Sequence, residues 1–519
     1  MLLQTALPGL FMNKVLSAIY DHAARTPEQV ALQSEAITLT YSQLVERVTV
    51  LAHWLQTQDV RRIGLWGENS IEWIIADLAA WQANVTLVPL PLFFSKTQLQ
   101  HVIDLAQLDY VLVCGDIAPV VSASKRVATP IERLSCDELR RPARQPGQVD
   151  NTIAKITFTS GTTGNPKGVC LSHHAIEHVT QALAEKIYCD STKGILNKHL
   201  NLLPLSTLLE NVAGVYVPLY LGKSVVVLAG KDLGFLGSSQ LSLPVLLKVL
   251  HQYQPNSLIV LPQILHGLVT AASQGYPLPP SLKFVAVGGA HTPPQLIQQA
   301  RSLNIPVYEG YGLSECASVV SLNHLTADKP GSVGKPLAHV QVKIQHGVIL
   351  VRGNGLNGYL GQPATHDEWF DTGDVGHIDE EGFLFVTGRK KNLLISSYGR
   401  NISPEWIEAE LLLGRHVEQA MVVGDAQAYC CAIVVPAEPE CDPCMILSDI
   451  NRINKTLPDY ARIHKIILVR EPFSTTNHLL TDNGRLRREA ILSRYAQAID
   501  ALYTEHLSSQ HPGVIYDLL

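Results

Sequence analysis

The chain has 519 residues, enough for three or four average domains or for fewer large ones, which excludes a disulfide-stapled miniprotein or a single small binding module. Apolar residues make up 46% of the sequence and charged residues only 17%, so the chain can bury a large core. Lysine and arginine number 40 against 46 aspartates and glutamates, a net charge of −6, which offers no broad positive field to a nucleic-acid backbone.

The cysteine pattern and the apolar segments bear on location. Nine cysteines are scattered without the dense, even spacing of a disulfide framework, which predicts reduced thiols and a cytoplasmic protein. The amino terminus lacks a basic leader followed by a sustained apolar run, so we expect no targeting peptide. The most apolar stretch, 202–227, is interrupted by Glu210 and Lys223, so we expect no transmembrane helix. A mean hydropathy of +0.12 is compatible with peripheral contact with a membrane.

Predicted strands and helices alternate from the start of the chain, a pattern typical of parallel sheets covered by helices. The expected order is strand 31–39, helix 41–55, strand 62–66, helix 70–81 and strand 85–90. A stretch rich in Arg, Pro and Gln, 140–148, then predicts a surface connection to the strand 153–158. The alternation continues to about residue 318.

The second half of the chain changes character twice. Short strands with glycine turns at 340–351 and 382–386 predict a smaller β unit. From about residue 392 the pattern is that of a compact α+β domain, whose first helix opens at Ser403-Pro404 because serine suits the N-cap and proline the first turn. The predicted fold class is therefore α/β, with a large N-terminal domain of parallel sheets covered by helices plus a small β unit, followed by a smaller α+β domain.

The strongest chemical signal follows the predicted strand 153–158. Residues 159–168 read TSGTTGNPKG; the glycines allow a tight turn, the hydroxyls add donors and Lys167 adds a mobile positive charge. This composition predicts a phosphate-binding loop. It is not a Walker A loop, because Pro166 precedes the lysine where that motif has glycine. A shorter fragment of the same kind would as readily be a flexible surface turn.

This loop is similar to the pyrophosphate-binding signature of the adenylate-forming superfamily, which includes acyl-CoA synthetases, luciferases and the adenylation domains of peptide synthetases. Further signatures follow in the same order over nearly the whole chain, at 311–315 (YGLSE), 369–374 (WFDTGD) and 388–392 (GRKKN). The chain is identified as a member of this superfamily. Within it, the segment 203–222 resembles the long-chain fatty acyl-CoA synthetase branch.

The resemblance implies a nucleotide site. It implies that Tyr311 stacks on adenine, that Glu315 ligates Mg²⁺, that Asp374 accepts both ribose hydroxyls and that Arg389 faces the ribose; carboxylates suit both a hard cation and a cis-diol. Alone, Glu315 would as readily cap a turn and the run at 388–392 would face water. The other implied nucleotide-binding residues are Thr159, Ser160, Gly161, Thr162, Thr163, Gly164, Lys167, Gly288, Gly289, Ala290, Gly312 and Ser314.

The resemblance also implies two domains that move. The large adenylating domain would span residues 1–388, a hinge 389–391 with Lys391 at its end, and a small mobile C-terminal domain 392–519. Gly399 would lie beside the pantetheine arm of the thiol acceptor, although a glycine serves equally well in any turn. The implied acceptor is CoA, and an acyl carrier protein, which presents the same thiol, stays an alternative.

Two departures from the family pattern concern the acid. Thr207 and Glu210 are the implied acid-binding residues, and Thr207 stands where the long-chain branch normally has histidine. Arg485 occupies the position of the lysine that clamps the carboxylate to the α-phosphate; arginine keeps the charge but is planar and bidentate. The implied catalytic residues are therefore Lys167, Glu315, Lys391 and Arg485. These departures leave open a nucleotide- or acyl-AMP-binding protein with a degenerate catalytic loop.

The implied reaction is ATP-dependent and has two steps. The carboxylate of an acid, by resemblance a fatty acid, attacks the α-phosphorus of ATP and expels pyrophosphate. The small domain then rotates about Lys391, the Arg485 loop gives way to the Gly399 loop, and the thiol of CoA takes the acyl group. We expect ATP, Mg²⁺ and CoA as cofactors, a small-molecule acid as substrate and no nucleic acid as partner.

Overall fold

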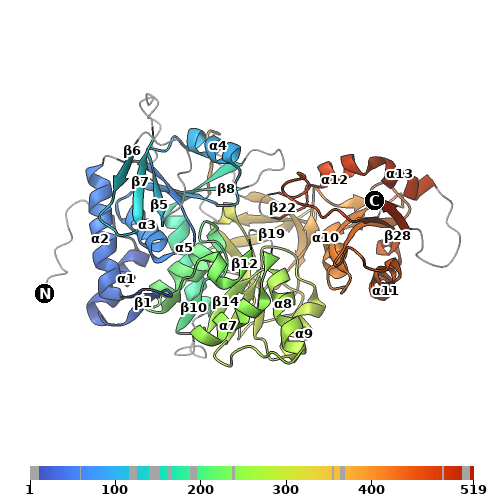
Figure 1. Ribbon diagram of the computed structural model, residues 1–519, viewed down its shortest axis with the longest axis horizontal. Helices are drawn as coiled ribbons and strands as arrows, with labels where there is room; N and C mark the ends of the chain where they lie inside the picture. The colour runs from blue at the N-terminus through green and yellow to red at the C-terminus, as the bar shows by residue number, and fades with distance from the viewer. Residues whose placement is uncertain are drawn as a thin grey trace.

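The computed structural model describes residues 11–58, 60–115, 125–139, 152–159, 166–187, 196–236, 240–353, 356–362, 369–398, 400–481, 484–504 and 515–518. Within these residues, two large mixed sheets and a small antiparallel sheet form a large N-terminal part, and a smaller α+β part follows at the C-terminal end (Figure 1). None of the described helices is both long and apolar enough to span a bilayer.

The first sheet carries the strand that precedes the phosphate loop. Its strands are β3 (Arg62–Trp66), β4 (Thr86–Leu90), β5 (Tyr110–Cys114), β6 (Lys125–Ala128), β7 (Leu134–Glu138), β8 (Ile153–Thr159), β9 (Lys167–Ser172) and β21 (Leu356–Tyr359). They lie in the order β21-β9-β8-β4-β3-β5-β7-β6, and the four strands β8, β4, β3 and β5 run parallel. Residues 154–158 of β8 are buried, as expected for a central strand covered on both faces.

The helices of the first half begin at side-chain caps that the sequence provides. They are α1 (Lys14–Arg25), α2 (Tyr41–Thr57), α3 (Ile71–Gln82), α4 (Lys96–Ala106) and α5 (His173–Ile187). The Thr40 and Gln43 side chains form a reciprocal capping box at α2, and the Ser70 hydroxyl caps α3. Such caps satisfy amide groups that have no partner inside the helix. The helices expected at 41–55 and 70–81 therefore form with ends shifted by one or two residues.

The second sheet positions most of the predicted nucleotide site. Its strands are β1 (Val30–Gln33), β2 (Thr38–Thr40), β10 (Lys198–Leu200), β11 (Ser224–Val226), β14 (Ser257–Val260), β15 (Phe284–Val287), β16 (Val307–Leu313), β17 (Ser318–Leu322) and β18 (Lys335–Pro336). They lie in the order β18-β17-β16-β15-β14-β10-β11-β1-β2. The strands from β16 to β1 run parallel, whereas both edges are antiparallel. Helices α7 (Leu243–Tyr253), α8 (Pro262–Ser273) and α9 (Pro294–Ser302) connect the central strands.

The single strand expected at 31–39 is wrong. The segment instead forms β1 and β2, which pair with each other in antiparallel fashion. The turn between them is closed by a hydrogen bond from the Ser34 amide to the Ile37 carbonyl (2.7 Å), and the Ser34 hydroxyl accepts from the Ile37 amide (3.0 Å). Local side-chain bonding of this kind favours a turn over an extended strand.

A buried polar cluster joins β8 to α3 and to a π-helix, η1 (Leu209–Tyr216), that leads into α6 (Val217–Tyr220). Lys155 Nζ donates to Asp77 Oδ1 (2.8 Å), Asn211 Oδ1 (2.5 Å) and Tyr216 OH (2.9 Å). Asp77 Oδ2 accepts from Asn211 and Tyr216. Because a buried charge is costly without such partners, the cluster fixes η1 against the strand that leads to the phosphate loop.

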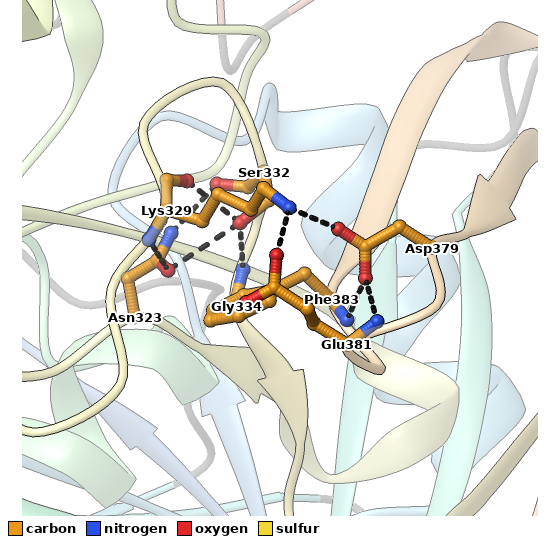
Figure 2. Close-up of polar contacts among 7 residues, drawn as sticks. All are labelled: Asn323, Lys329, Ser332, Gly334, Asp379, Glu381 and Phe383. Atoms are coloured by element: carbon orange, nitrogen blue, oxygen red, sulfur yellow. Dashed lines mark hydrogen bonds and ion pairs between the residues drawn. The ribbon is translucent and has the colours of Figure 1, made fainter.

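The small antiparallel sheet has the order β19-β20-β22-β23, from β19 (Gln341–Gln345), β20 (Val348–Arg352), β22 (Phe370–Ile378) and β23 (Leu384–Arg389). Figure 2 shows how it is tied to the second sheet. Lys329 Nζ lies 2.6 Å from Asp379 Oδ2 and 2.7 Å from Glu381 Oε1, in the turn between β22 and β23. The backbone of the Lys329 loop is held by Asn323, whose side chain bonds the Lys329 amide and the Ser332 carbonyl. This contact sets the position of β22.

The C-terminal part has cores of its own, made from residues beyond 390. Its main sheet has the order β26-β27-β28-β29, from β26 (Val417–Val423), β27 (Cys430–Pro436), β28 (Ile463–Val469) and β29 (Ile515–Leu518). The first helix begins at Pro404 as predicted. The helices and short strands of this part are α10 (Pro404–Leu411), α11 (Pro443–Asn454), α12 (Arg488–Arg494), α13 (Ala496–Thr504), β24 (Leu394–Ile395) and β25 (Asn401–Ile402). In the N-terminal part, β12 (Phe235–Leu236) and β13 (Gln240–Leu241) form a separate hairpin.

Candidate active site

A continuous cleft of about 3680 Å³ runs from the second sheet to the C-terminal part. It lies where β14, β15 and β16 end, which is where open parallel sheets bind ligands. Residues of both parts line it, including Gly288, Tyr311 and Asp374 from the N-terminal part and Arg485 from the C-terminal part. The structure thus gathers several of the predicted site residues around one space.

Asp374 occupies the centre of this region and is only 3% exposed. The Tyr311 hydroxyl donates to its Oδ2 (2.5 Å), and Arg389 Nε lies 2.7 Å from its Oδ1. Burial raises the pKa of Asp374, while the charge of Arg389 and the Tyr311 hydrogen bond act against that shift. Burial, with the neighbouring Asp374, also raises the pKa of Tyr311, so the phenol keeps its proton. Three residues predicted from separate motifs therefore form one hydrogen-bonded group.

Arg485 reaches across the cleft from the C-terminal part. Its Nη2 makes a long hydrogen bond (3.5 Å) with the carbonyl of Gly289. The residue is exposed toward the open cleft, yet surrounding protein atoms partly desolvate its guanidinium and lower its pKa; Arg389 adds to this shift, whereas Asp374 and Glu315 oppose it. Arg485 thus lies within electrostatic reach of the residues assigned to ribose and Mg²⁺.

Residues after β15 and at the end of β16 line one side of this region. Gly288, Gly289 and Ala290 line the cleft, and Gly289 adopts φ +82°, a conformation that favours glycine. At Gly312 an added Cβ would lie 1.7 Å from the Ser318 carbonyl oxygen, so no side chain fits there. Ser314 and Glu315 then form the short helix η3 (Ser314–Cys316), which also borders the cleft.

Tyr359 links Glu315 to the phosphate hairpin, which is the antiparallel pair β8 and β9 that flanks the predicted phosphate loop. The Tyr359 hydroxyl donates to Glu315 Oε1 (2.9 Å), and Tyr359 pairs with Val169 of β9. Thr159 at the end of β8 lies opposite Lys167 at the start of β9; Thr159 lines the cleft and Lys167 is exposed. The predicted ligands Ser160, Gly161, Thr162, Thr163 and Gly164 lie outside the described residues, as does Gly399.

Comparison with known proteins decides the family. A model of the AMP-binding enzyme family matches residues 19–360, and a model of the AMP-binding enzyme C-terminal domain matches residues 391–507. The chain belongs to the AMP-binding enzyme family. The predicted superfamily is confirmed, and so is the enzyme class, an AMP-forming acid–CoA ligase.

Relatives of this family member act on more than one kind of acid. The chain is 30% identical over 441 residues to the 2-succinylbenzoate–CoA ligase of Bacillus pumilus, which covers 80% of this chain and 85% of the relative. It is 24% identical over 597 residues to a long-chain-fatty-acid–CoA ligase of Mycobacterium bovis, covering 95% and 97%.

Solved structures of other proteins share the fold of this AMP-binding enzyme. An anthranilate CoA ligase in complex with anthranoyl-AMP has a TM-score of 0.77 at 17% identity, covering 95% of this chain and 99% of that one. The O-succinylbenzoate coenzyme A synthetase of Bacillus subtilis, in complex with AMP, has a TM-score of 0.71 at 22% identity, covering 91% and 97%. The predicted fold class is confirmed.

The two predicted acid-binding residues of this AMP-binding enzyme, Thr207 and Glu210, lie in different surroundings. Thr207 lines the cleft, and its hydroxyl donates to the Pro204 carbonyl (2.7 Å) at the turn before η1. Glu210 is fully buried within η1 and is not among the described residues that line the cleft. Its carboxylate accepts from His199 Nε2 (3.0 Å), Asn201 Nδ2 (2.7 Å) and the Leu203 amide (3.0 Å). All of these partners are protein groups, so the geometry assigns Glu210 a positioning role.

Sequence reasoning missed Glu309, two residues before Tyr311. Glu309 lines the cleft but is only 5% exposed, and its Oε2 has no hydrogen-bond partner among the described residues. Burial raises its pKa to about 8, although the adjacent Thr292 opposes the shift. The signal was a lone acidic residue in the otherwise uncharged strand β16, a position that usually needs a partner.

Lys391 lies just after β23, where the chain leaves the small sheet. It is exposed and lines the cleft. The preceding Lys390 amide donates to the Gly373 carbonyl (2.9 Å), and the Asn392 amide donates to the Arg389 carbonyl (3.0 Å). The first strand of the C-terminal part, β24 (Leu394–Ile395), follows, so the chain passes from one part to the other within a few residues.

Proposed function

We propose that the chain activates a carboxylic acid with an apolar body as acyl-AMP and transfers the acyl group to the thiol of CoA. The observation that carries the proposal is the meeting of Asp374, Arg389 and Arg485 in one cleft between the two parts of the chain. A hydrogen-bonded carboxylate beside cationic groups suits a nucleotide, whose ribose is a hydroxyl donor and whose phosphates are anionic.

The residues present fit ATP and Mg²⁺. Asp374 offers buried carboxylate oxygens to ribose hydroxyls, and Glu309 Oε2, which has no hydrogen-bond partner among the described residues, offers a polar group beside Tyr311. Among the described residues no group of three or more His, Cys, Asp or Glu could hold a metal alone, and this is compatible with Mg²⁺, which typically binds one or two carboxylates together with substrate phosphates. Glu315 would hold the ion, which would neutralise charge on the phosphates.

The first step would form the acyl-AMP bond. The acid carboxylate attacks the α-phosphorus, the bond to the β-phosphate oxygen breaks, and pyrophosphate leaves. Arg485 lies where it would hold two anionic oxygens together through its planar fork of donors. Lys167, at the base of the phosphate hairpin, would contact the leaving pyrophosphate. These charges stabilise the transition state because they are in place before reaction.

The second step requires the thiol to reach the acyl carbonyl. We propose that residues 389–391 are a hinge between domains at 1–388 and 392–519, and that rotation about Lys391 replaces the Arg485 loop by the loop around Gly399. The thiol then attacks the carbonyl carbon and AMP leaves. Arg485 lies on the C-terminal part, and its hydrogen bond to the N-terminal part, at the Gly289 carbonyl, is a long one, which supports a weakly held arrangement.

The acid would occupy the apolar section of the cleft. Its lining includes Leu183 and Ile187 of α5, Ala213 of η1, Val217 of α6, and Phe284 and Ala286 of β15. We propose a fatty acid as the substrate because these side chains are apolar and uncharged and can pack against an alkyl chain. An aromatic acid with a second carboxylate is the other candidate, favoured by Lys198 and Lys223, which also line the cleft.

An acid panel in the ATP–pyrophosphate exchange assay separates these candidates. Saturated fatty acids of increasing length would be compared with benzoates with and without a second carboxylate. The proposal predicts the highest kcat/KM for an aliphatic acid. A preference for the aromatic dicarboxylate that disappears in Lys198→Met or Lys223→Met would establish the second candidate instead.

The thiol acceptor and the location of the protein complete the proposal. CoA is favoured over an acyl carrier protein because the curated relatives are named as CoA ligases. Thioester formation with free CoA, compared with a phosphopantetheinylated carrier, tests the choice. The described cysteines are all free thiols, which supports a reducing compartment such as the cytoplasm.

A further inference from the structure

Three hydrogen-bonded polar residues, Glu210, His199 and Ser257, connect the buried η1 helix to the apolar section of the cleft. Glu210 Oε1 lies 3.0 Å from His199 Nε2, and His199 Nδ1 lies 2.9 Å from the Ser257 hydroxyl. Glu210 and His199 are 0% and 4% exposed. His199 and Ser257 both line the cleft. None of the nucleotide chemistry described above uses these three residues.

The hydrogen-bond partners of Glu210 indicate where the proton of the Ser257 hydroxyl lies. Glu210 is held by two further donors, Asn201 Nδ2 and the Leu203 amide, so its carboxylate acts as an acceptor toward His199. The Nε2 nitrogen of His199 therefore carries the proton, and in a neutral imidazole Nδ1 is then an acceptor. In that neutral form the Ser257 hydroxyl donates its only proton to Nδ1. The remaining lone pairs of the Ser257 oxygen are left for a partner in the cleft.

The position of Ser257 is far from the nucleotide. Ser257 begins β14 and pairs in register with Phe284, whereas the nucleotide-binding Gly288 follows the end of β15. Four residues of strand separate the two levels, about 13 Å at 3.3 Å per residue. Ser257 is half-buried, and the lining of the same cleft includes the apolar residues Ala213, Val217, Phe284 and Ala286. A polar group beside apolar lining is a typical specificity element.

We propose that Ser257, oriented by His199 and Glu210, selects acids that carry a hydrogen-bond donor, a hydroxyl or an N–H group, on the part of the molecule remote from the carboxylate. This inference rests on the proposed acid-activating function and names a class of acid within it. An acid lacking the donor cannot make this hydrogen bond to the Ser257 oxygen, so it binds less well.

The test compares three forms of the same acid in pyrophosphate exchange: unsubstituted, hydroxylated and as the methyl ether. The ether accepts hydrogen bonds but cannot donate one. The substituent is moved along a saturated fatty acid and around a benzoate ring. At one position, wild-type protein should prefer the hydroxy acid to its methyl ether by about tenfold or more in kcat/KM, chiefly through KM.

Ser257→Ala should reduce this preference to less than about threefold, because the hydroxy acid loses its hydrogen-bond acceptor. The matched control is Ser224→Ala, because Ser224 begins the strand on the other side of β10 and its hydroxyl donates to the Asn197 carbonyl. That control should keep the full preference.

Equal use of hydroxy acid and ether at every position by the wild-type protein overturns the inference, as does a preference that survives in Ser257→Ala. Either result leaves acid activation itself intact. No exchange with any acid would contradict the proposed function, and the inference would fall with it.

Discussion

Arg389 Nε lies 2.7 Å from Asp374 Oδ1, and the two residues are directly paired across strands β22 and β23. The Tyr311 hydroxyl, from the second sheet, donates to the other oxygen of the same carboxylate. Three strands thus fix the orientation of Asp374 before any nucleotide is bound. Preorganisation of this kind lowers the cost of binding, because the carboxylate does not have to be immobilised by the ligand.

Asp374→Ala should weaken ATP binding at least tenfold, because a hydrogen bond to a charged group contributes about 1.5–3 kcal/mol. Titration calorimetry with ATP measures the affinity, and circular dichroism checks the fold. Asp371→Ala is the control, since Asp371 lies on the same strand but is exposed and bonds its own turn at Gly373. Unchanged affinity in a folded Asp374→Ala protein would remove this residue from the ribose site.

Arg485→Ala should slow single-turnover formation of acyl-AMP by roughly 10²-fold, the scale of losing one preorganised charge at the transition state. Thioester formation from supplied acyl-AMP should change little, because the proposed rotation removes the Arg485 loop from the site before the second step. Arg485→Lys reports whether charge alone suffices. The neighbouring Arg487 also lines the cleft, so Arg487→Ala is the comparison. If acyl-AMP formation is normal in Arg485→Ala but slow in Arg487→Ala, Arg487 and not Arg485 is the cation that assists the first step.

Lys155→Met should destabilise the protein by about 3 kcal/mol or more, because it leaves the carboxylate of Asp77 buried without its cation. Urea unfolding followed by tryptophan fluorescence measures the effect, since Trp81 packs 4.9 Å from Tyr216 of the same cluster. Lys14→Met is the matched control. Its partner Glu177 is 3.8 Å away and Lys14 is 67% exposed, so a change within about 0.5 kcal/mol is expected. Equal stability of both variants would contradict the structural role of the cluster.

Glu309 should make stability depend on pH. Its folded-state pKa, raised to about 8 by burial, lies above the ordinary value of a glutamate, so the folded protein holds a proton that the unfolded chain has lost. Stability should therefore fall as pH rises from the ordinary glutamate range through about 8. Between pH 6 and 8 the wild type should lose about 2 kcal/mol more than Glu309→Gln. Thermal melts of both proteins, with the exposed Glu132→Gln as control, measure the difference; parallel curves would show that Glu309 is charged when folded.

The sequence predicted the elements whose signals are local. The helices after Thr40 and Ser70 and the strand before the phosphate loop form where their caps and apolar runs indicate. The strand expected at 31–39 failed, because a hydroxyl–backbone turn at Ser34 interrupts an apolar stretch that reads as continuous. A side-chain hydroxyl that bonds the backbone competes with strand pairing, and this competition gives little signal in the sequence pattern.

The site was predictable where a residue belongs to a local motif and less so where its position depends on contacts between distant elements. Tyr311, Asp374 and Arg389 were named from separate motifs, and the structure brings them into contact. The group of Glu210, His199 and Ser257 could not be inferred, because its members lie on η1, β10 and β14 and meet only through the order of strands in the second sheet. Glu309 was missed because a glutamate is an ordinary residue, and what makes this one unusual is its burial in the fold.

The central claim is that ATP is cleaved between its α- and β-phosphates by attack of an acid. The most direct measurement incubates the full chain with ATP, Mg²⁺, CoA and the acid preferred in the exchange panel, and quantifies every product. The account predicts AMP, pyrophosphate and acyl-CoA in equal amounts, with no AMP formed when the acid is omitted. Formation of ADP and phosphate in step with acyl-CoA would contradict it.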